Sequence, residues 1–205
     1  MRHVLKLKAC LSIILLGALA GCLGAPMAPI QELPPPQAPP PVSAGQPDQV
    51  ILEEALLGRA LSSGEVAGFS DRLLVEGNSA LNDQKTMARL EILLLKALKA
   101  PDKVHRPVIL RNLGIIHYHQ GKYKKARQEL QDSNELNPRD PRTHFYLARL
   151  FVQQGEIYQK QGKKKLSRQQ FKRANIEMEQ ARKLAPNNAT YKQDLKEILR
   201  QEQGK

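Results

Sequence analysis

PVILRNLGIIHYHQG, residues 107–121, is followed 34 positions later by PRTHFYLARLFVQQG, residues 141–155, which has the same outline. The residues that coincide at this offset are Pro107 with Pro141, Leu110 with His144, Leu113 with Leu147, Gly114 with Ala148, His117 with Phe151 and Gly121 with Gly155. A repeated helical hairpin cannot bury its apolar face alone, so hairpins stack and leave a groove for another molecule. The period therefore predicts a binding module.

The signature of this period resembles the tetratricopeptide repeat. The residues that carry the resemblance in the first copy are Leu110, Leu113, Gly114, His117, Ala126, Leu130 and Pro138. Small residues at Gly114 and Ala126 let two helices cross closely, and Pro138 ends the second helix. His117 stands where the repeat usually has an aromatic residue, and we expect this departure to weaken packing slightly. The resemblance implies an all-α fold of stacked hairpins.

The second copy is longer than the first. Its first helix keeps the offset of 34 residues, but its second helix does not. The matching residues there are Ala126 with Ala174, Leu130 with Met178, Leu136 with Leu184 and Pro138 with Pro186, which are 48 positions apart. The hairpin has therefore gained 14 residues relative to the first copy.

The position of the turn in this longer hairpin has two interpretations. A second Gln-Gly-Lys at 161–163 favours a turn at Gly162, with seven residues added to each helix. Two added turns keep the apolar face almost in phase and lengthen the hairpin by about 10 Å. The alternative is a turn at Gly155, with all the added residues in the loop and second helix.

We expect six segments along the chain. They are a lipoprotein signal peptide at 1–21, a lipidated cysteine with a proline-rich tether at 22–47, N-terminal helices at 48–102, the first repeat at 103–140, the lengthened second repeat at 141–187 and a C-terminal cap helix at 188–205. Within the N-terminal helices, the hydrophobic pattern predicts helices at about 49–62, 65–77 and 83–99. Ser62-Ser63-Gly64 is interpreted as the end of the first of these.

Apolar side chains are expected on particular faces of the predicted helices. Those of the helix at 83–99 are Met87, Leu90, Leu94 and Leu98, widened by Ile92, Leu93 and Leu95. If the helices at 65–77 and 83–99 form a degenerate repeat, Ala88, Ile92 and Leu95 would lie on its inner side. In the cap helix, Tyr191, Leu195 and Leu199 share one face, and Lys196 prevents close packing behind it.

The first 22 residues have the pattern of an export signal. Basic residues precede an apolar run at 9–20 that is too short to span a bilayer. Leu19-Ala20-Gly21-Cys22 resembles the lipobox of bacterial lipoproteins, which implies cleavage before Cys22 and acylation of its thiol. In that family Leu23 implies the outer membrane, with the chain facing the periplasm. The alternative is an ordinary signal peptide with an incidental cysteine.

Cysteine and proline usage fit this envelope location. Cys10 would leave with the signal, so the mature chain would have one thiol and no internal disulfide. Residues 23–47 contain nine of the 14 prolines and should form an extended tether. At about 3.1 Å per residue, such a tether reaches roughly 75 Å.

The first helix of each repeat is predicted to line a groove that binds a peptide or protein. The groove residues that the resemblance implies are Val108, Arg111, Ile115, Tyr118, His119, Arg142, Phe145, Arg149, Val152 and Gln153. Three arginines among aliphatic and aromatic residues would suit a partner with carboxylates. The alternative is that some of these side chains pack against neighbouring helices.

The lengthened hairpin carries a basic arm. It consists of Lys160, Lys163, Lys164, Lys165, Arg168, Lys172 and Arg173. Residues 102–205 hold 23 Lys and Arg against 11 Asp and Glu, which favours anionic partners. The arm is either a solvated surface or a contact for lipid head groups, a phosphorylated glycan or an acidic protein. Nucleic acid is not expected for an exported chain.

Neither a cofactor nor a metal nor an enzymatic activity is expected. His117 and His119 point to different faces of a helix, which disfavours a shared metal. The sequence has no Gly-x-Ser-x-Gly elbow and no phosphate-binding glycine loop. We expect a membrane-anchored scaffold or adaptor, with a pilotin-like assembly lipoprotein for a pilus or secretion channel as the alternative. An enzyme with an unrecognised site is the remaining, disfavoured class.

Overall fold

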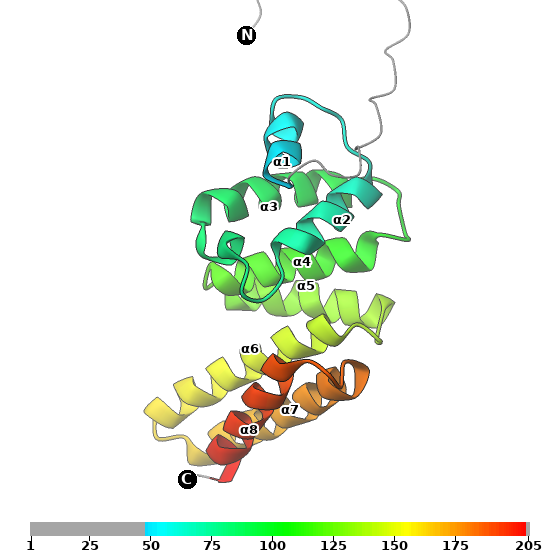
Figure 1. The fold of residues 1–205 in the computed structure, drawn as a ribbon. Coiled ribbons are helices and arrows are strands. Elements are labelled where there is room, and N and C mark those ends of the chain that lie inside the picture. Colours follow the sequence, from blue (N-terminus) through cyan, green and yellow to red (C-terminus); the bar gives the residue numbers. More distant parts are fainter. Residues whose placement is uncertain (1–47, 204–205) are drawn as a thin grey trace, which may run out of the picture. The chain divides into compact units, whose positions relative to one another are not determined.

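The computed structural model describes residues 48–203, which are built from helices (Figure 1). In chain order the elements are α1 (Asp48–Leu56), α2 (Ser63–Leu73), the 3-10 helix η1 (Ser79–Asn82), α3 (Gln84–Leu98), α4 (Arg106–His119), α5 (Tyr123–Leu136), α6 (Pro141–Lys160), α7 (Lys164–Leu184) and α8 (Ala189–Gln203). The all-α prediction is confirmed. Cys22 and the predicted signal and tether lie outside the described residues. Among the helices described, none has the length and apolar character needed to cross a bilayer.

The boundary between α1 and α2 differs from the prediction. α1 ends at Leu56, and Gly58 follows with a φ of +111°, which side chains rarely adopt. Ser62 then begins α2. Its Oγ accepts a hydrogen bond from the Glu65 backbone N–H (3.2 Å), and Glu65 Oε2 accepts one from the Ser62 backbone N–H (2.8 Å). Because this reciprocal capping box marks a helix start, the interpretation of residues 62–64 as a helix end is wrong.

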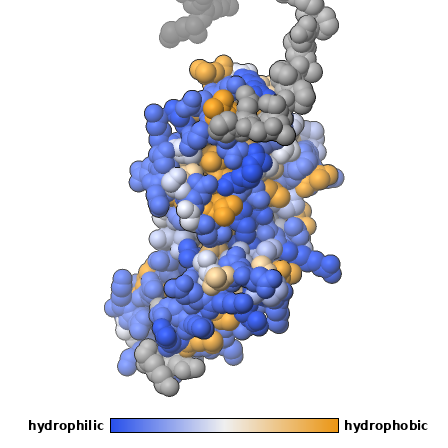
Figure 2. Space-filling view, in the orientation of Figure 1, coloured by the Kyte–Doolittle hydropathy of each residue, from blue (hydrophilic) through white to orange (hydrophobic). Residues whose placement is uncertain are grey.

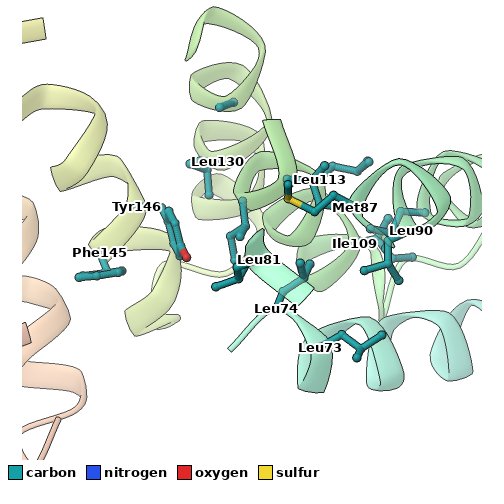
Figure 3. Close-up of a cluster of buried hydrophobic side chains, with 14 of the residues drawn as sticks. Leu73, Leu74, Leu81, Met87, Leu90, Ile109, Leu113, Leu130, Phe145 and Tyr146 are labelled. Carbon is teal, nitrogen blue, oxygen red and sulfur yellow. The ribbon is translucent and has the colours of Figure 1, made fainter. Parts of the chain in front are cut away.

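α3 confirms the helix expected at 83–99 but buries one face only. Asp83 caps it, and Met87 and Leu90 point into the core formed with α2 and α4 (Figure 3). Leu94 is also fully buried. The prediction that Ala88, Ile92 and Leu95 lie inside is wrong, since all three are exposed. These residues lie on the side of α3 that faces away from its neighbours α1, α2, α4 and η1.

α4 and α5 form the first repeat. Gly114 lies where the two helices cross, because a Cβ added there would be 2.6 Å from Leu130 Cγ. Ala126, on the other helix, is fully buried. The turn between the helices uses Gly121, whose φ is +72°. The small residues of the repeat therefore have the close-packing role that the sequence predicts.

α6 and α7 form the longer second hairpin. They contain 20 and 21 residues, whereas α4 and α5 contain 14 each. The turn is at Gly162, with a φ of +71°, and α6 continues through Gly155. A Cβ at Gly155 would be 2.9 Å from Phe171, so this glycine marks a second close approach rather than a turn. The structure therefore has the first of the two predicted arrangements.

α8 packs against α7 and covers the end of the array. Its buried residues are Tyr191, Leu195 and Ile198, while Leu199 is at the exposed edge of the same face. The expected inward position of Leu199 is thus taken by Ile198, one residue earlier. Lys196 is exposed, as predicted. One cluster of buried apolar side chains runs from α1 to α8, and polar residues cover most of the face shown in Figure 2.

Candidate partner-binding groove

The predicted groove residues lie on α4 and α6, which contact each other. Ile115 and Phe145 are fully buried, and Val108 is partly buried. Segments of the chain itself cover much of this surface. α2 and the loop after it lie against the first residues of α4 and α6, and α8 lies against the middle of α6. The expectation that all ten residues face an open groove is therefore wrong.

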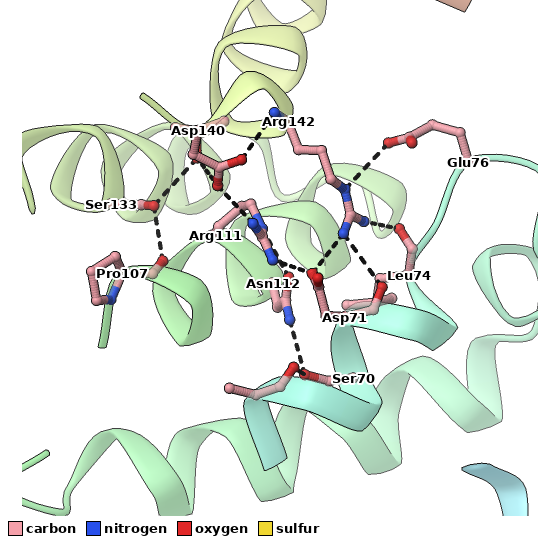
Figure 4. A network of polar contacts seen from close by, with 12 residues as sticks. Ser70, Asp71, Leu74, Glu76, Pro107, Arg111, Asn112, Ser133, Asp140 and Arg142 are labelled. Atoms are coloured by element: carbon pink, nitrogen blue, oxygen red, sulfur yellow. Dashed lines mark hydrogen bonds and ion pairs between the residues drawn. The ribbon is translucent and has the colours of Figure 1, made fainter. Parts of the chain in front are cut away.

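Arg111 is the centre of a buried ionic network (Figure 4). Its guanidinium donates to Asp140 Oδ2 at 2.7 Å and also to Asp71 Oδ1 on α2. Its Nε donates to Asn112 Oδ1 at 3.1 Å, and Asn112 Nδ2 donates to Ser70 Oγ at 2.9 Å. Because all these groups lie within the chain, Arg111 joins α2 to the first repeat and does not face a partner.

Arg142 is also bound by α2 and the loop after it. Its Nη1 donates to Asp71 Oδ1 at 2.6 Å, and Nη2 donates to the Leu74 carbonyl. Glu76 Oε1 is 3.8 Å from Nε. Asp140 accepts a hydrogen bond from the Arg142 backbone N–H and caps α6. Arg142 thus holds this loop against the second repeat.

α8 covers the middle of α6. The ring of Tyr191 lies 4.7 Å from that of Phe145, centroid to centroid. Arg149 lies over the Phe145 ring, with its guanidinium carbon 4.4 Å from the ring centroid. Its Nε donates to Asp194 Oδ2 at 3.0 Å. The charge of Arg149 is therefore balanced by a carboxylate of α8.

Aromatic side chains gather where α4 ends. Tyr118 and Tyr146 pack edge to face at 5.4 Å, and His119 Nε2 is 3.2 Å from the Tyr146 hydroxyl. Burial raises the pKa of Tyr118, whereas burial and the charge of Arg149 lower the pKa of His119. The neutral forms of both side chains are thus favoured at this position.

One part of the groove is open. A pocket of about 230 Å³ lies between α4, α6 and α8. Its lining residues are Tyr118, Arg149, Val152, Gln153, Glu156, Asp194, Glu197 and Ile198. Four of these belong to the predicted groove, and the other four come from the extension of α6 and from α8. Arg149 is bound to Asp194 and Glu197 to Arg200 (3.2 Å), so the remaining charged group of the lining is the Glu156 carboxylate.

His117 is fully buried and polar in its contacts. Its Nε2 is 2.9 Å from Glu91 Oε1 on α3, and its Nδ1 bonds Glu129 on α5. His117 therefore connects α3, α4 and α5 by polar contacts at the position where the repeat usually has an aromatic residue. Burial alone would raise the pKa of Glu91, but hydrogen bonds from His117 and Gln120, with the charges of His117 and Lys122, lower it to about 2. His119 points instead toward Tyr146, as expected for a different face.

The basic arm lies on the surface of the α6–α7 hairpin. Lys160, Lys163, Lys164, Lys165, Arg168, Lys172 and Arg173 are all exposed. Two of them contact aromatic rings: Lys163 lies 5.9 Å from the centroid of Tyr158, and Arg173 lies 5.9 Å from that of Phe151. Among the described residues, none of the seven has a carboxylate within 4.0 Å.

The acidic residues that bind the groove arginines were not found from the sequence. Asp71 and Glu76 lie in and after the weakly patterned α2, and Asp194 lies on the cap helix. The residues of these pairs are 40 to 71 positions apart, so no local period reports them. Only charge could have indicated these acidic partners from the sequence, because three arginines on a surface that packs in a helical stack require acidic neighbours.

Comparison with known proteins agrees with this architecture. The tetratricopeptide repeat family matches residues 107–140, which form α4, α5 and the turn after them. The chain is also 36% identical over 87 residues to the photosystem I assembly protein Ycf3 of Rippkaea orientalis. That match covers 42% of this chain and 50% of the relative, so the chain spans about half the relative's length. From the repeat match, the relative and the stacked hairpins, we conclude that this chain contains a tetratricopeptide repeat at residues 107–140.

Proposed function

We propose that this protein is a membrane-anchored scaffold of a bacterial envelope, which holds a partner protein through the open pocket between α4, α6 and α8. The main observation in favour of this proposal is that α2 and α8 close the remainder of the groove, whereas this pocket is open. The relative is named as an assembly protein, which supports a role in bringing subunits together. The repeat and this relative point to a non-catalytic scaffold.

The chemistry of the pocket favours a basic or apolar segment of the partner. Arg111, Arg142 and Arg149 are each bound by carboxylates of this chain. A partner carboxylate would have to displace those contacts, and it would approach the Glu156 carboxylate. Tyr118 and Val152 supply an apolar floor, and the Glu156 carboxylate attracts a lysine or arginine. Acidic groups of a partner would instead suit the exposed basic arm.

The membrane anchor of this proposal is the acyl group at Cys22. The lipobox-like residues 19–22 support it, and Leu23 supports the outer membrane. A proline-rich tether of up to roughly 75 Å would let the repeats reach a partner away from the bilayer. Labelling of cells with a radioactive fatty acid tests the anchor, because Cys22→Ser should abolish incorporation.

Photo-crosslinking in the native envelope tests the pocket. Benzoylphenylalanine replaces Tyr118 or Val152, both in the pocket, or Ile176, an exposed residue of α7 that serves as the control. We expect the same protein from the two pocket positions and not from Ile176, with capture lost in Glu156→Lys. Equal capture from Ile176, or capture unaffected by Glu156→Lys, would reject the pocket. A channel subunit as the captured protein would favour the pilotin-like alternative over an adaptor.

A further inference from the structure

The tip of the α6–α7 hairpin extends beyond the first repeat. Relative to α4 and α5, its helices are six and seven residues longer, respectively. At 1.5 Å per residue, the additional length is about 10 Å. Four lysines surround the turn at this end: Lys160, Lys163, Lys164 and Lys165. All four are exposed, and none lies within 4.0 Å of a carboxylate among the described residues.

The same tip exposes apolar side chains. Ile157 and Leu166 are each 40% exposed, although they are large aliphatic residues. Ile157 comes five positions before Gly162 and Leu166 four positions after it, so both lie at nearly the same distance from the turn. That distance is about 7 Å along the helix axes, from the rise of 1.5 Å per residue.

We propose that this tip, residues 157–166, inserts into the head-group region of an anionic lipid bilayer. Because Lys160, Lys163, Lys164 and Lys165 lie nearer the turn than Ile157 and Leu166, the hairpin would enter side-on rather than turn first. Ile157 and Leu166 would then reach the boundary between head groups and acyl chains, at the depth of ~5–10 Å that interfacial apolar residues occupy. The lysines would remain at the phosphates, because their long stems let the ammonium groups extend to the polar layer.

Charge and apolarity together favour a bilayer over the other anionic surfaces. A phosphorylated glycan or an acidic protein surface would satisfy the lysines but would leave Ile157 and Leu166 in water. A neutral bilayer would accept the aliphatic groups but would offer no net negative charge to attract the lysines. An anionic bilayer satisfies both sets of groups. The tip is separate from the groove pocket, so this inference does not depend on what binds there.

Tryptophan fluorescence tests the insertion directly. The chain contains no tryptophan, so Leu166→Trp introduces a single reporter at the tip. The matched control is Leu184→Trp, since Leu184 lies at the other end of α7 and is 39% exposed. The full-length protein is reconstituted with vesicles of phosphatidylcholine alone or with added phosphatidylglycerol. We expect the emission of Leu166→Trp to shift to shorter wavelength with the anionic vesicles only, and that of Leu184→Trp to remain unchanged.

Charge removal tests the role of the lysines. Replacing Lys163, Lys164 and Lys165 by glutamine in Leu166→Trp should reduce the inserted fraction at least about tenfold, because each lysine near an anionic surface contributes appreciably. The matched set is Lys183, Lys192 and Lys196, which are exposed and lie away from the tip. Its replacement should have little effect. An unchanged emission of Leu166→Trp on anionic vesicles, an equal shift on neutral vesicles, or an equal loss in the matched set would each overturn the proposal.

Discussion

Single glycines determine how closely the helices of each repeat approach. Gly114 contacts Leu130 in the first hairpin, and Gly155 contacts Phe171 in the second. Neither has a positive φ, so their role is steric rather than conformational. Gly68 differs from both, because the nearest atom to an added Cβ would be an Arg72 guanidinium nitrogen at 3.9 Å. Alanine substitutions at these three glycines therefore distinguish the packing effect of an added methyl group from its effect on helix propensity.

We expect Gly114→Ala to destabilise the protein by about 1–2 kcal/mol. The added methyl would overpack against Leu130, at a cost of ~1–3 kcal/mol, which exceeds the ~1 kcal/mol that alanine contributes through helix propensity. Gly68→Ala keeps the second effect without the first and should stabilise by up to ~1 kcal/mol. Urea unfolding of both variants measures the difference. A Gly114→Ala protein that is as stable as Gly68→Ala would contradict the close crossing.

Glu91 should make the stability of the fold depend on acid. Its folded pKa of about 2 is below its ordinary value of 4.5, so the ionised carboxylate stabilises the folded state above pH 4.5. This contribution is lost as the pH falls from about 4.5 to 2. We expect Glu91→Gln to lower the free energy of unfolding at pH 7 by about 1 kcal/mol and to reduce its dependence on pH between 4.5 and 2. Chemical unfolding between pH 2 and 7 checks this, with the exposed Glu135→Gln as a control of smaller effect.

At the scale of elements, the two hairpins could be predicted because their contacts are local. The period of 34, the added 14 residues and the second Gln-Gly-Lys together place four helices and two turns. The start of α2 was predicted two residues late, at 65, although Ser62 and Glu65 form a capping box. The reason is that Ser62-Ser63-Gly64 was interpreted as the end of the preceding helix. The exposed face of α3 could not be predicted, since apolar residues occupy both of its sides and only the neighbouring helices select one.

Deleting residues 156–169 should leave a folded protein with two repeats of equal length. The deletion joins Gln154-Gly155 to Gln170-Phe171-Lys172-Arg173-Ala174, which matches Gln120-Gly121-Lys122-Tyr123-Lys124-Lys125-Ala126 position by position. Gly155 would then take the turn role of Gly121. We expect a single cooperative unfolding transition and a helix content reduced only by the removed residues, measured by circular dichroism.

A deletion of ten residues, 156–165, provides the control. Ten residues are not a whole number of heptads, so the apolar face of α7 would turn away from α6. This variant should unfold at lower urea concentration than the 14-residue deletion although it removes less of the chain. The reverse order of stability would argue against an insertion that adds two turns to each helix of the hairpin.

At the scale of the whole molecule, partly buried ion pairs connect the N-terminal helices to the repeats. Arg111 joins α2, α4 and the start of α6 through Asp71 and Asp140. We expect Arg111→Met to cost about 3 kcal/mol, because it leaves the buried Asp140 without its charged partner. Arg182→Met, which breaks a surface pair with Glu179, should cost less than ~1 kcal/mol. Urea unfolding compares the two, and a similar small cost for both would contradict the structural role of Arg111.

The candidate site could be predicted only in part for the same reason. The positions of Tyr118, Val152 and Gln153 follow from the repeat, and they do line the open pocket. The closure of the groove around Arg111, Arg142 and Arg149 depends on α2 and α8, which lie outside the matched repeat. Side-chain identity alone thus predicted a partner with carboxylates, whereas our proposal for the assembled pocket is a basic or apolar segment.

The heptad steps in the second hairpin constrain how far this molecule can extend. Adding or removing residues keeps Phe171 and its neighbours directed toward α6 only when each helix changes by whole heptads. The distance from the groove to the hairpin tip is therefore adjustable only in increments of about 10 Å. The hairpin acts as a molecular spacer whose permitted lengths form a discrete series, and a change of one or two residues would alter its packing before it altered its reach.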